Sequence, residues 1–183
     1  MQMPREQNVD FTNQSLILDP KDYQAIGTAI TLISRLEGLL AGILLIQEFG
    51  VGTPPDESKH RHRMQAMMKK SFRKRTEKLL SVVLEKTGSE ETRKRVDEVL
   101  DLVIKWRDFL CHANIGKLPD GRLQGDFWDR KSFDKDHGHI TRTFEAKDLY
   151  QLTQSVLQLS IWLTEEFEIE RDARERLAHQ TSQ

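Results

Sequence analysis

An apolar segment near the start of the chain, AIGTAITLISRLEGLLAGILLI, constrains the fold more than any other part of the sequence. It spans residues 25–46 and is as long as a membrane-spanning helix. However, Arg35 and Glu37 lie at its middle, where ionisable groups are costly in lipid. We therefore expect no membrane association and a buried helix of a soluble protein, in which Gly38 and Gly42 permit close packing against another helix.

The composition agrees with a single soluble domain. A chain of 183 residues can bury a core without disulfides or metals. Cys111 is the only cysteine, so one chain can form neither a disulfide nor a Cys-based zinc site. The N-terminal residues lack the apolar region of a secretion signal, and we expect a cytoplasmic protein.

Hydrophobic periodicity predicts four principal helices. They are expected at about residues 19–49, at 58–86, from residue 90 to an end near Asn114, and at 146–170. The first has Asp19 as a good N-cap and Pro20 at its first helical position. After the third helix, Asn114 and Gly116 are residues that can end a helix in the left-handed conformation.

Between the third and fourth predicted helices the pattern changes to that of strands. The turn signals LPDGR and DKDHGH flank LQGDFWDRKSF, and HITRTFE alternates with Ile140 and Phe144 on one side. We therefore predict an all-α fold, a four-helix up-and-down bundle with a short β-hairpin inserted between the third and fourth helices. Residues 1–18 should form an N-terminal arm, residues 19–170 the domain, and residues 171–183 a charged tail.

The end of the third predicted helix carries an unusual group of polar residues, Arg107, Asp108, His112 and Asn114. Arg107 lies on or beside the apolar stripe of this helix. On an ideal helix Arg107 and His112 are about 140° apart with a rise of about 7.5 Å, so they would not share one face. However, His112 lies in the last turn, where the helix can unwind, and a two-fold dimer would bring two such helix ends together. Asp108 is four residues from His112 and can orient the imidazole, whose protonated form the C-terminal dipole favours. Such a histidine suits general acid–base chemistry.

This arrangement resembles the Arg-x4–6-His signature of HEPN (higher eukaryotes and prokaryotes nucleotide-binding) domains, over about residues 20–168. In that family a polar residue commonly follows the arginine, as Asp108 does here, although Asn is more common. The resemblance implies a homodimer with a metal-independent endoribonuclease site, built from the arginine and histidine of both subunits. It also implies a toxin or defence effector, with a possible antitoxin or regulatory partner. A second pair of the same spacing, Arg174 and His179, lies in the charged tail without an apolar stripe.

A purely structural interpretation of the same residues stays open. Arg107 can form an interhelix salt bridge, perhaps to Glu37, and His112 can bond the last helix carbonyls. Because buried charges persist only when paired, we expect Glu37 to hold Arg107, with Arg35 and Asn114 as further supporting residues.

Residues 59–75, KHRHRMQAMMKKSFRKR, carry eight Lys or Arg and no acid, in a chain of net charge −1. This segment favours contact with an RNA backbone, although a solvated helix face has the same pattern, as has a basic amphipathic helix that binds a protein or an anionic membrane. The RNA-binding residues that we predict are Arg61, Arg63, Lys69, Lys70, Arg73 and Lys74. The paired histidines 60/62 and 137/139 lack a third ligand, so no metal or other cofactor is expected. The alternative to a ribonuclease is a non-catalytic helical module that binds a protein or nucleic acid.

Overall fold

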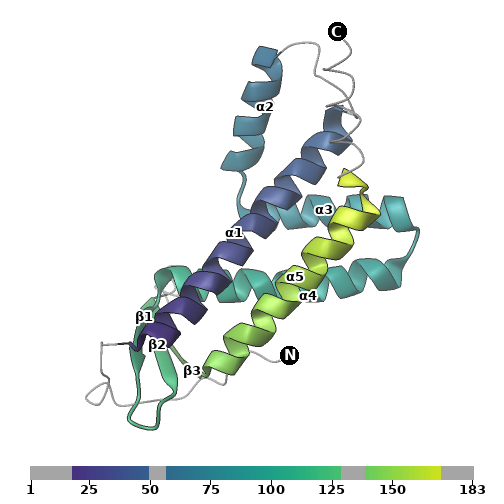
Figure 1. The fold of residues 1–183 in the computed structure, drawn as a ribbon. Coiled ribbons are helices and arrows are strands. Elements are labelled where there is room, and N and C mark those ends of the chain that lie inside the picture. Colours follow the sequence, from purple (N-terminus) through teal and green to yellow (C-terminus); the bar gives the residue numbers. More distant parts are fainter. Residues whose placement is uncertain (1–17, 50–56, 129–138, 170–183) are drawn as a thin grey trace. The chain divides into compact units, whose positions relative to one another are not determined.

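The structure, a computed structural model, describes residues 18–49, 57–128 and 139–169. This part of the chain is mostly helical and also forms a small antiparallel sheet (Figure 1). The helices are α1 (Pro20–Phe49), α2 (Glu57–Lys69), α3 (Phe72–Thr87), α4 (Glu90–His112) and α5 (Ala146–Glu166). The strands are β1 (Asn114–Lys117), β2 (Leu123–Trp128) and β3 (His139–Phe144).

The chain divides into two compact units. One comprises residues 1–33 with 102–155 and contains the sheet, and the other comprises residues 34–101 with 156–183 and contains α2 and α3. The predicted arm, except Leu18, and the predicted tail with Arg174 and His179 lie outside the described residues.

Helix α1 begins where its capping residues predict. The backbone N–H groups of Asp22 and Tyr23 donate to the carbonyl of Asp19, at 2.9 and 3.1 Å. Within the described residues, α1 is the one helix long and apolar enough to cross a membrane, with a mean hydropathy of 1.9 over an 18-residue window. A core helix of a soluble protein meets the same criteria. A Cβ atom added at Gly38 or Gly42 would meet no atom within 4 Å. The expectation that these glycines permit close helix packing is therefore wrong for contacts among the residues that the structure describes.

The predicted second helix, residues 58–86, is in fact two helices. Helix α2 ends at Lys69, and the Ser71 side chain caps α3 by accepting a hydrogen bond from the backbone N–H of Lys74 at 3.4 Å. Ser71 is a strong N-cap residue, and its local hydrogen bond competes with continuation of the helix. Helix α3 then ends at Gly88, which has a φ of 64° in the left-handed region.

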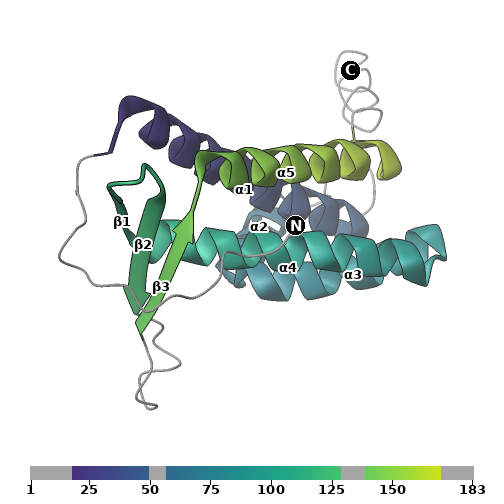
Figure 2. The same cartoon turned by 90° about the horizontal axis from the view of Figure 1, so that it is seen from below.

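The predicted hairpin is a three-stranded antiparallel sheet in the order β1-β2-β3. The additional strand, β1, contains Asn114 and Gly116, which we had expected to end the preceding helix in the left-handed conformation. Neither has a positive φ, whereas Gly121 in the β1–β2 turn has a φ of 86°. Only Ala113 separates α4 from β1, and Figure 2 shows the three strands side by side next to the end of α4.

An aromatic cluster joins α4 to one face of the sheet. The ring centroid of Phe109 lies 5.9 Å from that of Phe127 and 5.6 Å from that of Phe144, in edge-to-face geometry. Trp106 packs on Phe144 in the same way, at 5.5 Å. Between these rings, Gly125 lets Phe109 approach the backbone of β2, since a Cβ there would lie 2.3 Å from Cζ of Phe109.

Substitution of Gly125 by alanine should therefore lower the free energy of unfolding, by about 1–3 kcal/mol, because Phe109 or the strand must shift. The matched control is Gly38→Ala, at an open helical position. There alanine should stabilise the protein by about 0.5–1 kcal/mol through helix propensity. Urea denaturation followed by circular dichroism measures both effects. Equal stabilities of the two variants would contradict the close approach.

Candidate functional site: the polar end of helix α4

The last turns of α4 separate apolar from polar side chains. Trp106, Phe109 and Leu110 are at most 6% exposed and form the buried face. The solvent-facing residues are Arg107, which is half-buried, and Asp108, Cys111 and His112, which are exposed. These four positions span an arc of about 140° on an ideal helix. Arg107 and His112 lie at its two edges.

Arg107 and Asp108 interact directly. The Nη1 atom of Arg107 donates to Oδ1 of Asp108 at 3.1 Å. In the described part of the chain no hydrogen bond joins Asp108 to His112, so the carboxylate orients the guanidinium rather than the imidazole. Asn114, the first residue of β1, is also exposed. The predicted residues 107, 108, 112 and 114 are therefore grouped at one accessible helix end.

The residue types at the end of α4 determine which chemical steps this helix end can support. A solvent-facing imidazole can accept and return a proton, and a planar guanidinium can hold a phosphate through two parallel hydrogen bonds. Within one chain the two groups occupy opposite edges of the exposed arc. A site that uses both at one phosphate therefore needs a second copy of this helix end.

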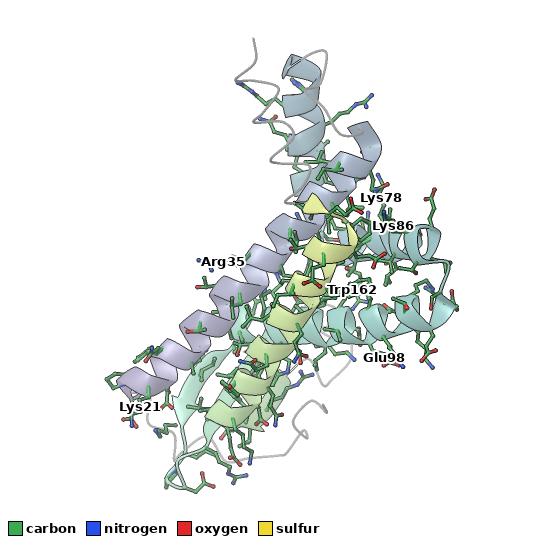
Figure 3. All side chains as sticks on the ribbon, turned by 45° about the vertical axis from the view of Figure 1, so that its right-hand side comes forward. Lys21, Arg35, Lys78, Lys86, Glu98 and Trp162 are labelled. Carbon is green, nitrogen blue, oxygen red and sulfur yellow. The ribbon has the colours of Figure 1, made fainter. Side chains whose placement is uncertain are left out.

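The two predicted supporting residues of α1 belong to the other unit. Arg35 is exposed, and Figure 3 shows it projecting outward from the helix, so its place in an apolar segment is explained by solvation. Glu37 is 18% exposed and accepts from the Nη2 atom of Arg75 at 2.7 Å. Arg75 is itself only 4% exposed. A link from Glu37 to Arg107 would join the two units and stays a prediction.

Arg75 is a buried charge within the basic segment, residues 59–75, and is not among the predicted RNA-binding residues. A signal for it was present, since Phe72, Arg75, Thr76, Leu79 and Val83 follow helical spacing and all are buried. Its guanidinium also lies over the Phe72 ring, 5.9 Å from the centroid. Arg75 therefore belongs to the folded core of this unit rather than to the solvent-facing basic residues.

Removal of the charge of Glu37 tests this pair. Glu37→Gln should lower the free energy of unfolding by about 2–3 kcal/mol, because the guanidinium of Arg75 would stay buried without its counter-charge. The control, Glu91→Gln, removes an acid from an exposed pair with Arg95 and should change stability little. Chemical denaturation at pH 7 measures both. A Glu37→Gln variant as stable as the control would show that the pair is not an important contact.

The predicted RNA-binding residues are all exposed. They are Arg61, Arg63, Lys69, Lys70, Arg73 and Lys74. Two of them make long ion pairs, Arg63 with Glu48 at 3.7 Å and Arg73 with Asp101 at 3.9 Å. Pairs this long and this exposed contribute little to stability.

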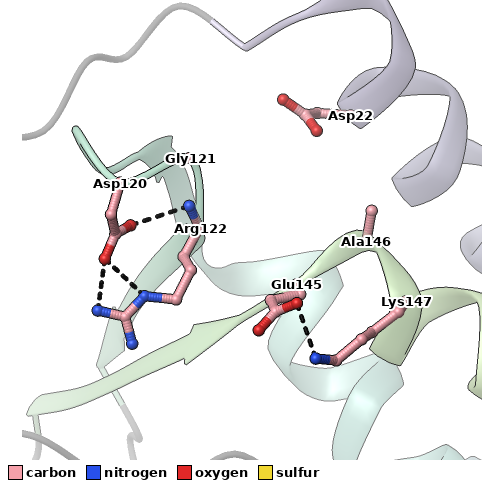
Figure 4. A pocket seen from close by; sticks show the side chains of 7 residues that line it. All are labelled: Asp22, Asp120, Gly121, Arg122, Glu145, Ala146 and Lys147. Atoms are coloured by element: carbon pink, nitrogen blue, oxygen red, sulfur yellow. Dashed lines mark hydrogen bonds and ion pairs between the residues drawn. The ribbon is translucent and has the colours of Figure 1, made fainter.

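A cleft of about 480 Å³ lies in the unit that contains the sheet (Figure 4). It is lined by Asp22, Asp120, Gly121, Arg122, Glu145, Ala146 and Lys147. Its charged groups pair with one another or with Lys117: Asp120 with Arg122 at 2.6 Å, Glu145 with Lys147 at 2.9 Å, and Asp22 with Lys117 at 2.8 Å. Because each charge in the lining has an opposite charge beside it, the cleft favours no ion of either sign.

Lys117 of β1 connects the start of α1 to the sheet. Its Nζ atom donates to Asp19 at 2.6 Å and to Asp22 at 2.8 Å. The hydrogen bond from Lys117 holds the pKa of Asp19 below its ordinary value of 3.8. The hydrogen bonds to Asp19 and Asp22 raise the pKa of Lys117 above 10.5.

These two shifts define a pH window for the contact. The contribution of Asp19 is present above pH 3.8 and is lost as the pH falls further, and that of Lys117 is present below pH 10.5 and is lost as the pH rises further. Lys117→Met should therefore destabilise the protein most near pH 7, with the difference from wild type shrinking at both extremes. Thermal unfolding across pH measures this. Lys86→Met, at an exposed lysine, is the control, and a pH-independent effect of Lys117→Met would refute the assignment.

Comparison with known proteins finds no matching family model, no matching curated protein and no matching solved structure. The candidate site therefore rests on the residues at the end of α4 and on their geometry.

Proposed function

We propose that the protein is a metal-independent endoribonuclease of the HEPN type, with Arg107 and His112 as its catalytic residues. One observation carries the proposal: both side chains reach solvent at the end of α4, directly after a turn whose opposite face is buried in the aromatic cluster. Asp108 holds the guanidinium of Arg107 and acts as a positioning residue.

In the proposed reaction the imidazole of His112 takes the proton of a ribose 2′-hydroxyl. The 2′-oxygen then attacks the adjacent phosphorus, and the bond from phosphorus to the 5′-oxygen breaks. The leaving 5′-oxygen takes up a proton, so the products are a 2′,3′-cyclic phosphate and a 5′-hydroxyl. Arg107 donates to the phosphate oxygens and stabilises the charge that accumulates on them in the transition state.

The proposed assembly is a homodimer in which the arginine of one copy acts with the histidine of the other. This follows from the separation of the two side chains around α4, since one copy alone presents them at different edges. A cytoplasmic toxin or defence effector, built as a four-helix bundle and controlled by an antitoxin or another regulatory protein, is the biological setting that the family resemblance suggests. The exposed basic residues of α2 and α3 would bind the RNA backbone.

An RNA-cleavage assay in excess EDTA tests the proposal. Wild-type protein should cut RNA and leave 2′,3′-cyclic ends. Arg107→Ala and His112→Ala should each lower the rate by about 10²- to 10⁴-fold while the fold is retained. The control Arg95→Ala changes an exposed arginine of α4 that lies outside both the helix end and the basic segment, and it should retain activity. RNA that is bound in a gel-shift assay but never cut would instead support the alternative, a non-catalytic binding module.

Mixing the two inactive variants tests the shared site. If subunits exchange freely, half of the dimers contain one Arg107→Ala copy and one His112→Ala copy, and one of the two sites in each is intact. About a quarter of the wild-type activity should then return. If subunit exchange is demonstrated and activity still does not return, both catalytic residues act within one copy.

A further inference from the structure

Helix α5 carries an exposed apolar stripe. Among the residues that the structure describes, five large apolar or aromatic side chains are exposed, and three of them belong to α5. These are Tyr150 at 65%, Leu157 at 38% and Ile161 at 56%. Because α5 is one uninterrupted helix, the three lie within an arc of about 40° (Figure 1). Exposed apolar side chains that gather on one face, rather than singly, indicate a contact surface.

Opposite charges lie at the two ends of this stripe. Lys147 and Glu165 are both exposed. They are separated by about five full helical turns, so they project from α5 in the same direction, about 60° to one side of Tyr150. Lys147 also pairs with Glu145 at 2.9 Å, but both side chains are exposed and such a pair is weak. With a cation at one end and an anion at the other, this flank is complementary to itself when a second copy of α5 runs antiparallel.

One register brings both the charged and the apolar positions together. If two α5 helices pair antiparallel about a two-fold axis at position 156, Lys147 of one copy lies opposite Glu165 of the other. In that register Tyr150 lies within about 1.5 Å, along the helix axis, of the position of Ile161 of the other copy. The two copies of Leu157 then lie about 3 Å apart along the axis, beside the two-fold axis. An unrelated partner would not need this internal symmetry, so the spacing favours a second copy of the chain.

We propose that the exposed stripe of α5 forms an antiparallel two-fold interface with the same stripe of a second copy. The inference gives the proposed homodimer a contact surface and in that respect rests on the proposed function, although its evidence comes from α5 alone. The apolar side chains supply affinity, and the two Lys147–Glu165 pairs fix orientation and register. A contact between two helix faces is small, so the dimer should dissociate on dilution.

Sedimentation velocity of the full-length protein without RNA, over a series of concentrations, tests the apolar stripe. Wild type should be a dimer that dissociates on dilution. Ile161→Glu should weaken dimerisation by about 100-fold or more, because each interface would bury two unpaired carboxylates. The matched control is Leu84→Glu, at an exposed leucine of α3, which should dimerise as wild type does. A wild type that is monomeric at every concentration, or equal dimerisation of the two variants, would overturn the interface.

Charge reversal tests the antiparallel register. Lys147→Glu and Glu165→Lys should each weaken dimerisation by about tenfold, because like charges then meet at both ends of the stripe. Both changes suit the helix dipole, so the fold should be retained, as circular dichroism would verify. An equimolar mixture of the two variants should dimerise as tightly as wild type, since each end again joins a carboxylate to an ammonium group. Lys86→Glu, at an exposed lysine of α3, is the control and should have no effect. A mixture that stays as weak as the single variants would overturn the proposed pairing.

These measurements do not depend on catalysis. A wild-type monomer would overturn the interface whether or not the protein cuts RNA. A dimer that loses its mass in Ile161→Glu and recovers it in the charge-reversed mixture, but cuts no RNA, would refute the ribonuclease and leave the interface standing.

Discussion

The contact of Phe109 with Gly125 fixes the part of the molecule on which the candidate site depends. It brings the ring of Phe109 against the backbone of β2, where Phe127 and Phe144 surround it. Close packing of this kind tolerates little displacement. The orientation of α4 about its own axis is therefore set here, and with it the direction in which Arg107, Asp108 and His112 point.

The same packing accounts for the polar face of the sheet. Once Leu123, Gly125 and Phe127 face α4, alternation turns Gln124 and Asp126 to the other side. The burial of apolar groups thus orients two sets of polar groups at once, one on the helix and one on the sheet.

Much of the helical content was predictable from local signals. Asp19 and Pro20 mark the start of α1, and the apolar spacing in α4 indicates that Arg107 flanks a buried stripe. The break at Ser71 was predictable in principle, but a helical pattern continuing on both sides concealed it. The pairing of Glu37 with Arg75 could not be predicted from the sequence, because residues 38 positions apart carry no local sign of their contact. The strand character of Asn114 and Gly116 was also missed, since both residues favour turns and only pairing with β2 makes them extended.

Because β1 follows α4 after a single residue, the position of His112, the proposed proton acceptor, is tied to that of the sheet. With Ala113 as the sole connecting residue, His112 cannot move far unless β1 moves with it. In the described residues β1 is the outer strand on its side, paired with β2 alone. Outer strands open more often than central ones in native proteins. The lifetime of the β1–β2 hydrogen bonds, observable as amide hydrogen exchange, would thus set how long the helix end keeps a defined geometry between openings.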